Sequence, residues 1–327
     1  MRLINFSDPE HTHRAGIFSK NFVYSQSSKE YFVCLTRDET IIDTQSMVDD
    51  LIGSGRATSI VFYDIFHADP RMNNRWVPFI KQTSTKIPVQ WITVNKLPIQ
   101  NFSTIHYDFY WNRCKSIHLD GPWQFKWKNN GIPCGHHALQ WQPRSHQYLA
   151  PVSNYSLPGS PLNRLDLLNF LKQYSGFYSN KSENKYLETD SLDDDGIGHI
   201  GNVPVAKHYY DNSYVSCQIE SQCLTGGSIV FSEKTYDHLI QGRLVLNFGP
   251  QYFYQTLEQQ GWRLWEGIDL SWDSIADDYV RWKKYIKCLK NLLDLDMPDL
   301  HDIFLLNKSN LEHNWQQLYD RPYDYLD

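Results

Sequence analysis

The stretch FSEKTYDHLIQGRLVLNFG, Phe231–Gly249, contains one unit of an α/β fold. Ser232 is a residue type that caps helices, and Glu233 and Lys234 follow it where the first turn would lie. Apolar residues then recur at helical spacing as far as Gly242, and glycine commonly ends helices. LVLNFG follows with the apolar run of a buried strand. The stretch therefore predicts a helix that leads into a strand of a parallel sheet.

The Glu233 and Lys234 pair allows two interpretations. Free N–H groups at the start of a helix can bind a phosphate, and Lys234 would add a full positive charge beside a diphosphate. A glutamate there does not favour an anion, but it can accept hydrogen bonds from a ribose diol. The helix dipole alone also favours glutamate in a first turn, so elementary physics favours an ordinary solvated helix end.

The alternation of strands and helices extends over most of the chain. Strands are predicted at residues 3–6, 31–36, 59–64, 89–94, 103–111, 176–179, 213–219, 244–249 and 262–267. Helices are predicted at residues 44–55, 74–83 (interrupted at Pro78), 160–176, 232–242, 251–261, 277–293 and 309–319. Residues 122–160 are expected to have little regular structure, and the acidic stretch 180–202 to be a loop. This alternation is typical of parallel α/β sheets.

Composition narrows the class of protein. The 327 residues are long enough for two domains, and the net charge of −6 gives no overall footprint of a nucleic-acid-binding protein. The six cysteines include no CxxC pair, so we expect neither a zinc site nor a disulfide framework, and reduced thiols in a cytosol fit better. No signal peptide and no membrane span are expected, because the apolar runs are too short.

The block from Ser228 to Trp282 resembles the C-terminal half of a group of phage-encoded glycosyltransferases. That group shows a Thr/Ser-Glu-Lys-Thr start, a helix, an apolar strand that ends in glycine, an LxxxGF motif and an acidic DxSYD segment. The matching positions in this chain are Ser232 to Thr235, Leu257 with Gly261 and Trp262, and Asp269, Ser271, Trp272 and Asp273. Tryptophan replaces the aromatic residue of the group's pattern at positions 262 and 272.

The same Glu-Lys start is similar to the nucleotide-binding segment of α-1,3-fucosyltransferases. The resemblance implies that Glu233 contacts a ribose and Lys234 a diphosphate, with Ser232 and Thr235 in the same nucleotide-sugar-binding segment. Upstream, Tyr148 to Ser179 resembles the phage group's first strand and Arg-led helix of the C-terminal domain. Arg164 occupies the arginine position, which implies a contact with a donor phosphate; a surface arginine is the alternative.

These resemblances imply a GT-B fold, with two Rossmann-like domains whose parallel sheets face a central cleft. The expected division is an acceptor-side domain at residues 1–145, a nucleotide-sugar-binding domain at residues 146–290 and a helical extension at residues 291–327. Below about residue 100 the resemblance is one of strand order alone.

A glycosyltransferase that inverts the anomeric centre needs a general base near the acceptor hydroxyl. Asp64 ends the apolar strand SIVFYD, and His67 and Asp69 follow in the same loop. We expect Asp64, with His67, to supply the base. The polar cluster at residues 8–13 is the competing candidate, and either set can be an ordinary loop.

Two patterns resemble metal-ligand motifs but are poor evidence for a metal site. Residues 193–195 contain a DxD motif, but it lies in an acidic, glycine-flanked loop rather than at a strand end, so a solvated charge run is favoured. The histidines at 11 and 13 and at 136 and 137 lack partners at helical spacing. We therefore expect no metal site.

The sequence thus predicts a metal-independent glycosyltransferase that moves a sugar from a nucleoside diphosphate to a hydroxyl, with the nucleotide sugar as co-substrate and no other cofactor. A hydroxymethylated pyrimidine in phage DNA is one candidate acceptor, which an enzyme would reach by base flipping. Surface glycans and small metabolites are others, and the acidic net charge counts against DNA. A non-catalytic GT-B-like module that binds a nucleotide or glycan is the rival hypothesis. The expected location is the cytoplasm, that of an infected host if the protein is phage-encoded.

Overall fold

The computed structural model describes residues 30–34, 41–64, 70–93, 104–106, 108–119, 134–151, 164–180, 183–189, 205–220, 223–225 and 229–322. The chain divides into two compact units. The first comprises Met1–Phe109, Gly226–Val230 and Tyr323–Asp327, and the second comprises Tyr110–Thr225 and Phe231–Pro322. The second unit thus begins before residue 146, where the predicted second domain begins, and it includes most of the predicted extension.

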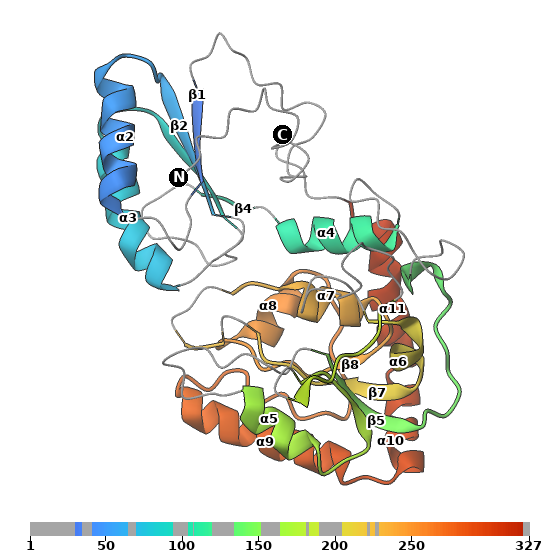
Figure 1. Cartoon of the computed structure of the whole chain (residues 1–327). Coiled ribbons are helices and arrows are strands. Elements are labelled where there is room, and N and C mark those ends of the chain that lie inside the picture. Colours follow the sequence, from blue (N-terminus) through green and yellow to red (C-terminus); the bar gives the residue numbers. More distant parts are fainter. Residues whose placement is uncertain are drawn as a thin grey trace. The chain divides into compact units, whose positions relative to one another are not determined.

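The first unit contains a four-stranded parallel sheet (Figure 1). Its strands lie side by side in chain order: β1 (Glu30–Cys34), β2 (Ser59–Asp64), β3 (Val89–Thr93) and β4 (Thr104–His106). Phe62 of β2 is paired in register with Val33 on one side and Trp91 on the other. The strands predicted at 31–36, 59–64 and 89–94 are confirmed, whereas the strand predicted at 3–6 lies outside the described residues.

Helices α2 (Ile41–Gly53) and α3 (Pro70–Ser84) cover the same face of this sheet (Figure 1). Alternate residues of a strand point to one face, and Ile60 and Phe62 of β2 do so here. They belong to one buried cluster with Leu51 of α2 and Phe79 of α3. Burial of each large apolar side chain contributes about 1.5–3 kcal/mol, so this shared core holds both helices on the sheet.

Helix α3 continues through Pro78, where the sequence predicts an interruption. Proline removes one N–H donor and crowds the preceding turn of a helix. Trp76, Phe79 and Ile80 flank the proline, and all three side chains are buried in the core of the first unit. Tertiary packing on both sides of Pro78 therefore outweighs the local penalty.

The strand predicted at residues 103–111 is mostly wrong. Only Thr104–His106 is a strand, and α4 (Phe109–His118) follows it. Trp111, Cys114 and His118 are buried, and their spacing places them on one face of a helix. The helical period of these buried residues decides the structure.

The second unit contains a second parallel sheet, with the strand order β6 (Gly176–Tyr178), β5 (His146–Ala150), β7 (Ser213–Ser216) and β8 (Leu244–Val245). Residues 122–160, predicted to have little regular structure, therefore include β5. Besides α4, the helices among the described residues of this unit are α5 (Arg164–Leu171), α6 (Lys207–Asp211), α7 (Glu233–Leu239), α8 (Phe253–Gln259), α9 (Asp278–Leu293), α10 (Met297–Leu306) and α11 (Lys308–Asp320), with a 3-10 turn at Cys134–His136. Figure 1 shows α5 and α9 on one face of the sheet and α7 on the other.

The strand order creates a point where the winding of the second sheet reverses. From β5 the chain passes through α5 to β6 at one edge, and from β7 it passes through α7 to β8 at the other edge. β5 and β7 are neighbours, so their connections leave in opposite directions. In open α/β sheets, ligands bind beyond the carboxyl ends of the strands at such a reversal.

The strand predicted at Trp262–Gly267 is wrong, because side chains of the C-terminal helices bind this segment instead. The Asn314 amide accepts from the N–H of Arg263 and donates to its carbonyl, at 2.8 Å each. Asn307 does the same for Glu266, at 2.7 and 2.9 Å. Two asparagines thus supply the hydrogen bonds that a neighbouring strand would have made.

Candidate functional site

Ser232 caps α7, as the sequence predicts. Its backbone is extended, with φ −88° and ψ −178°, and its hydroxyl oxygen accepts a hydrogen bond from the Lys234 N–H at 3.2 Å. The Ser232 carbonyl accepts from the N–H groups of Thr235 and Tyr236. The cap therefore fixes the Ser-Glu-Lys-Thr segment as the first turn of α7.

Glu220 lies at the carboxyl end of β7 and binds this first turn. Beyond β7 the chain continues beside the residues that follow β8, with Glu220 N–H donating to the Phe248 carbonyl. Glu220 is only 1% exposed. It accepts the hydroxyl protons of Ser232 at 2.6 Å and of Thr235 at 2.5 Å. Glu220 was not predicted, and its only signal in the sequence is an acidic residue directly after the apolar run SYVSCQI.

Glu233 and Lys234 form an ion pair. The Lys234 ammonium lies 2.7 Å from Glu233 Oε1 and 3.3 Å from the Ser232 hydroxyl oxygen. Lys234 is 7% exposed and the Glu233 side chain 15% exposed, so the pair is neither a solvated helix end nor fully enclosed. This burial disfavours one of the two interpretations of the sequence, an ordinary solvated helix end.

Asn247, which follows β8, binds the first turn of α7 through its side-chain amide. Its amide nitrogen donates to the Lys234 carbonyl at 2.9 Å and to the Thr235 hydroxyl oxygen at 3.0 Å. The Thr235 hydroxyl therefore accepts from Asn247 while it donates to Glu220. Residues that follow β7 and β8 thus both hold the segment.

Arg164 is the first residue of α5 and is buried. Burial raises the pKa of the Cys223 thiol to about 12; the positive charges of Arg164 and Arg281 oppose this shift, and Glu220 adds to it. Arg164 begins the helix that follows β5, and Glu220 follows β7, the parallel neighbour of β5, so both lie beyond the carboxyl ends of these strands. Ser160 and Pro161, the predicted start of this helix, lie outside the described residues.

Asp64 is the last residue of β2, in register with Thr93 of β3. It therefore lies at the carboxyl end of the first sheet, as predicted, although its side chain is outside the described part of the structure. His67, Asp69, the cluster at residues 8–13 and the acidic run at 193–195 also lie outside the described residues. Their predicted roles remain predictions.

Cys114, His118 and Asp237 form a buried group of metal-ligand types whose ligand atoms all lie within 4.8 Å of one another. The Gly135 N–H donates to His118 Nδ1 at 3.1 Å, and the Gln241 amide nitrogen lies 3.4 Å from the same atom. The neutral ring therefore carries its proton on Nε2, 3.2 Å from Asp237 Oδ1. An ion at Nε2 would force this proton onto Nδ1, towards the Gly135 N–H. The arrangement favours a hydrogen-bonded pair, and the expectation of no metal stays a prediction.

His238 on α7 lies in a second buried chain of hydrogen bonds. Its Nδ1 lies 2.6 Å from the Ser216 hydroxyl, and its Nε2 lies 2.7 Å from the Gln218 amide nitrogen. Since an amide nitrogen donates, the ring proton sits on Nδ1 and points at Ser216. Burial lowers the His238 pKa to about 4, and Asp237 opposes this shift. His238 is therefore a neutral donor to Ser216 and does not activate it as a nucleophile.

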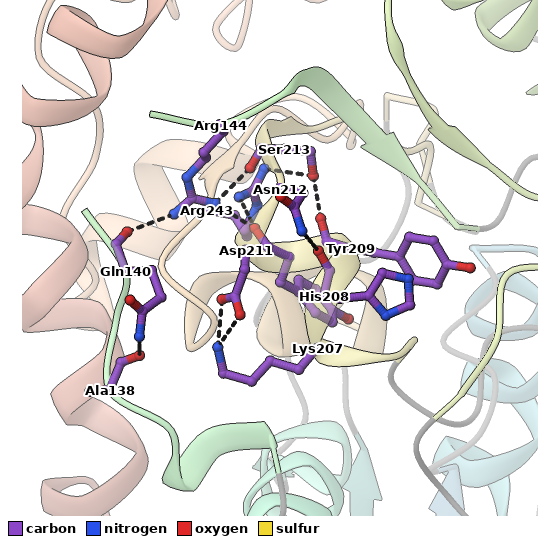
Figure 2. A network of polar contacts seen from close by, with 11 residues as sticks. Ala138, Gln140, Arg144, Lys207, His208, Tyr209, Asp211, Asn212, Ser213 and Arg243 are labelled. Atoms are coloured by element: carbon purple, nitrogen blue, oxygen red, sulfur yellow. Dashed lines mark hydrogen bonds and ion pairs between the residues drawn. The ribbon is translucent and has the colours of Figure 1, made fainter. Parts of the chain in front are cut away.

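The opposite end of the second sheet holds a network of two buried arginines (Figure 2). Arg144 lies just before β5 and Arg243 just before β8. Both donate to the Tyr210 carbonyl near the end of α6; Arg144 also donates to the Ser213 carbonyl at 2.7 Å and Arg243 to the Ser213 hydroxyl at 3.1 Å. Burial lowers the Arg144 pKa to about 10, and Asp211, which pairs with Lys207, opposes this shift.

Comparisons of the chain with protein-family models, with curated proteins and with solved structures find no match. Within the described residues, no helix is both long enough and apolar enough to cross a bilayer. Any function must therefore be argued from the side chains of this chain.

Proposed function

We propose that the protein is a glycosyltransferase that moves a sugar from a nucleoside diphosphate to an acceptor hydroxyl. The observation that carries this proposal is the position of the Ser232 to Thr235 segment. It is bound by Glu220 at the carboxyl end of β7, one of the two strands at which the winding of the second sheet reverses. Open α/β sheets bind nucleotides at this kind of position.

In the proposed mechanism, two cations stabilise the departing diphosphate in place of a metal. Lys234 contributes the ammonium and Arg164 the guanidinium, both from the first turns of helices of the second unit. Glu233 accepts hydrogen bonds from the ribose, which requires Lys234 to exchange Glu233 for the diphosphate. Asp64, with His67, removes the proton of the acceptor hydroxyl.

The proposed arrangement is GT-B, in which two Rossmann-like domains enclose donor and acceptor. Two parallel sheets support the Rossmann-like part of this proposal, with helices between β1, β2 and β3 of the first sheet and between the consecutive strands of the second. The acceptor that we would test first is a hydroxymethylated pyrimidine in DNA, in the cytoplasm of an infected host. A surface glycan is the next.

A panel of nucleoside-diphosphate sugars that differ in base and sugar tests the proposal. A donor that binds the folded state raises the melting temperature, and an active transferase also hydrolyses it slowly without an acceptor. Lys234→Ala should abolish the stabilisation. Lys290→Ala, which removes an exposed lysine paired with Asp294 on α9, is the matched control and should leave it unchanged. If Lys234→Ala binds the donor as well as the wild type, the assigned site is wrong.

A non-catalytic module that binds a nucleotide or glycan is the second candidate. The Glu233–Lys234 ion pair suits it, because binding a diphosphate requires only that Lys234 exchange its partner. Incubation of the stabilising donor with hydroxymethylated DNA, followed by mass spectrometry of the nucleosides, separates the candidates. Donor binding without hydrolysis, and without transfer to DNA or glycan acceptors, would favour the module.

A further inference from the structure

We infer that Glu220 is a positioning residue of the proposed diphosphate site: it holds the Ser232 hydroxyl so that Lys234 stays at the start of α7. The role in the reaction rests on the proposed function, whereas the effect on Lys234 does not.

The count of protons on the two hydroxyls carries the inference. Each hydroxyl has one proton to donate, and Glu220 accepts the protons of both Ser232 and Thr235. The Ser232 oxygen then presents only lone pairs to its other neighbours. These neighbours are the N–H and the ammonium of Lys234, at 3.2 and 3.3 Å, and both are donors.

Without Glu220 the Ser232 proton has no acceptor on that side. The hydroxyl then loses the bond that fixes its orientation, so its lone pairs are no longer held towards the two Lys234 donors, and the hold of Ser232 on the ammonium weakens. Glu220 is almost fully buried, so water does not readily replace it as the acceptor. The Glu220 carboxylate thus controls the orientation of Lys234 through one hydroxyl.

Two substitutions test this step without any ligand. Glu220→Met keeps the length of the side chain and removes both acceptors, and Glu220→Gln keeps one acceptor and replaces the other by a donor. Thr235→Val is the matched control, because it removes the other hydroxyl bound to Glu220 and leaves the Glu220–Ser232–Lys234 contacts intact. Ser232→Ala removes the intermediate hydroxyl and should reproduce the effect of Glu220→Met.

The first measurement is the rate at which Lys234 is acetylated by a water-soluble reagent, followed by peptide mass spectrometry. A buried and paired lysine reacts slowly. We expect the rate to rise several-fold in Glu220→Met and Ser232→Ala, less in Glu220→Gln, and not at all in Thr235→Val. An unchanged rate in both Glu220→Met and Ser232→Ala overturns the inference, whatever the variants bind. If Glu220→Met does not fold, Ser232→Ala and Glu220→Gln decide in the same way.

The second measurement uses inorganic pyrophosphate, which carries the charge of a diphosphate without base or sugar. Its affinity should fall about tenfold in Glu220→Met, the change expected when one hydrogen bond to a charged group is lost. Lys290→Ala, which removes an exposed lysine of α9, should keep the wild-type affinity. If the wild type binds neither pyrophosphate nor any nucleoside diphosphate, the proposed function fails, while the acetylation rates still decide whether Glu220 positions Lys234. An affinity in Glu220→Met equal to that of the wild type contradicts the role of Glu220 in this site.

Discussion

At the amino end of the second sheet, Arg144 and Arg243 bind mainly main-chain carbonyl groups near the end of α6 and the start of β7, and Arg243 also binds the Ser213 hydroxyl. At the carboxyl end, Lys234 binds the Ser232 hydroxyl and the Glu233 carboxylate, and Glu220 binds the hydroxyls of the α7 turn. Both ends bury charged groups. They differ in what the charged groups bind.

A carbonyl group of the main chain cannot turn away from its partner without a change in the backbone. In a dry interior few other donors can replace an arginine, so its loss removes a hydrogen bond that is not made elsewhere. A hydroxyl or a carboxylate can rotate and exchange one partner for another. Charges held by side chains can therefore be released to a ligand, whereas charges held by carbonyls mainly stabilise the fold.

The largest expected effect is at the amino end. Arg243→Met should lower the free energy of unfolding by about 3 kcal/mol, because it removes the guanidinium from a fully buried network and leaves the Ser213 hydroxyl without this donor. Urea unfolding followed by circular dichroism measures the change. Arg243→Lys should not restore the stability, since a single ammonium cannot reproduce the two-pronged geometry of the guanidinium.

A loss below about 0.5 kcal/mol in Arg243→Met, typical of exposed sites, would remove the distinction between the two ends. Lys290→Ala serves as the exposed control on α9 and should stay within that range.

Asn307, between α10 and α11, and Asn314 of α11 extend the same principle to neutral groups. Asn314→Ala leaves both the N–H and the carbonyl of Arg263 without their side-chain partner and should lower the free energy of unfolding by about 2–3 kcal/mol. Glu312→Ala changes an exposed residue of the same helix and should have little effect. Equal free energies of unfolding for these two variants would show that water replaces Asn314. Hydrogen bonds from side chains to the main chain would then contribute little to the stability of this unit.

The parts of the fold that follow from local patterns were predictable. Apolar runs and helical periods indicate both parallel sheets, and Ser232 is recognisable as a cap because a cap depends on neighbouring residues. Pro78 and the segment Trp262–Gly267 were misread because residues distant in the chain decide them. Asn307 and Asn314 follow the segment that they bind by more than 40 residues.

The candidate site was predictable only in part, for the same reason. Lys234 and Arg164 lie at helix starts, as their motifs predict. Glu220 contacts hydroxyls 12 and 15 residues away, and no local pattern marks it. The ion pair between Glu233 and Lys234 was also not predicted, because adjacent residues of a helix do not normally face each other. The Lys234 side chain reaches it by folding back towards Ser232.

His238 lies on α7 and gives a pH-dependent test of the buried groups at the carboxyl end of the second sheet. Its pKa of about 4 in the folded protein lies below the ordinary value of 6.5. Between pH 6.5 and pH 4 the unfolded chain binds a proton that the folded chain does not, so stability is full above pH 6.5 and falls as the pH decreases. The loss is about 2 kcal/mol at pH 5, from about 1.4 kcal/mol for each pH unit.

Urea unfolding at pH 7 and pH 5 measures this loss. His238→Gln should show a smaller difference between the two pH values than the wild type, because it cannot take up the proton. His313→Gln, at a partly exposed position of α11, should keep the wild-type difference. A wild-type difference that persists in His238→Gln would assign the pH dependence to other groups.

The smallest expected effect on stability is at Lys234 itself. Lys234→Met keeps the apolar stem and removes an ammonium that binds only side chains, which can turn to other partners, so we expect a loss of about 1.5 kcal/mol. Urea unfolding measures it beside Arg243→Met under the same conditions. A loss as large as that of Arg243→Met would mean that the Glu233–Lys234 pair is fixed structure, unable to exchange for a ligand. If Lys234→Met loses little stability but no longer binds the donor, the Lys234 ammonium is a charge that a ligand can take over from Glu233.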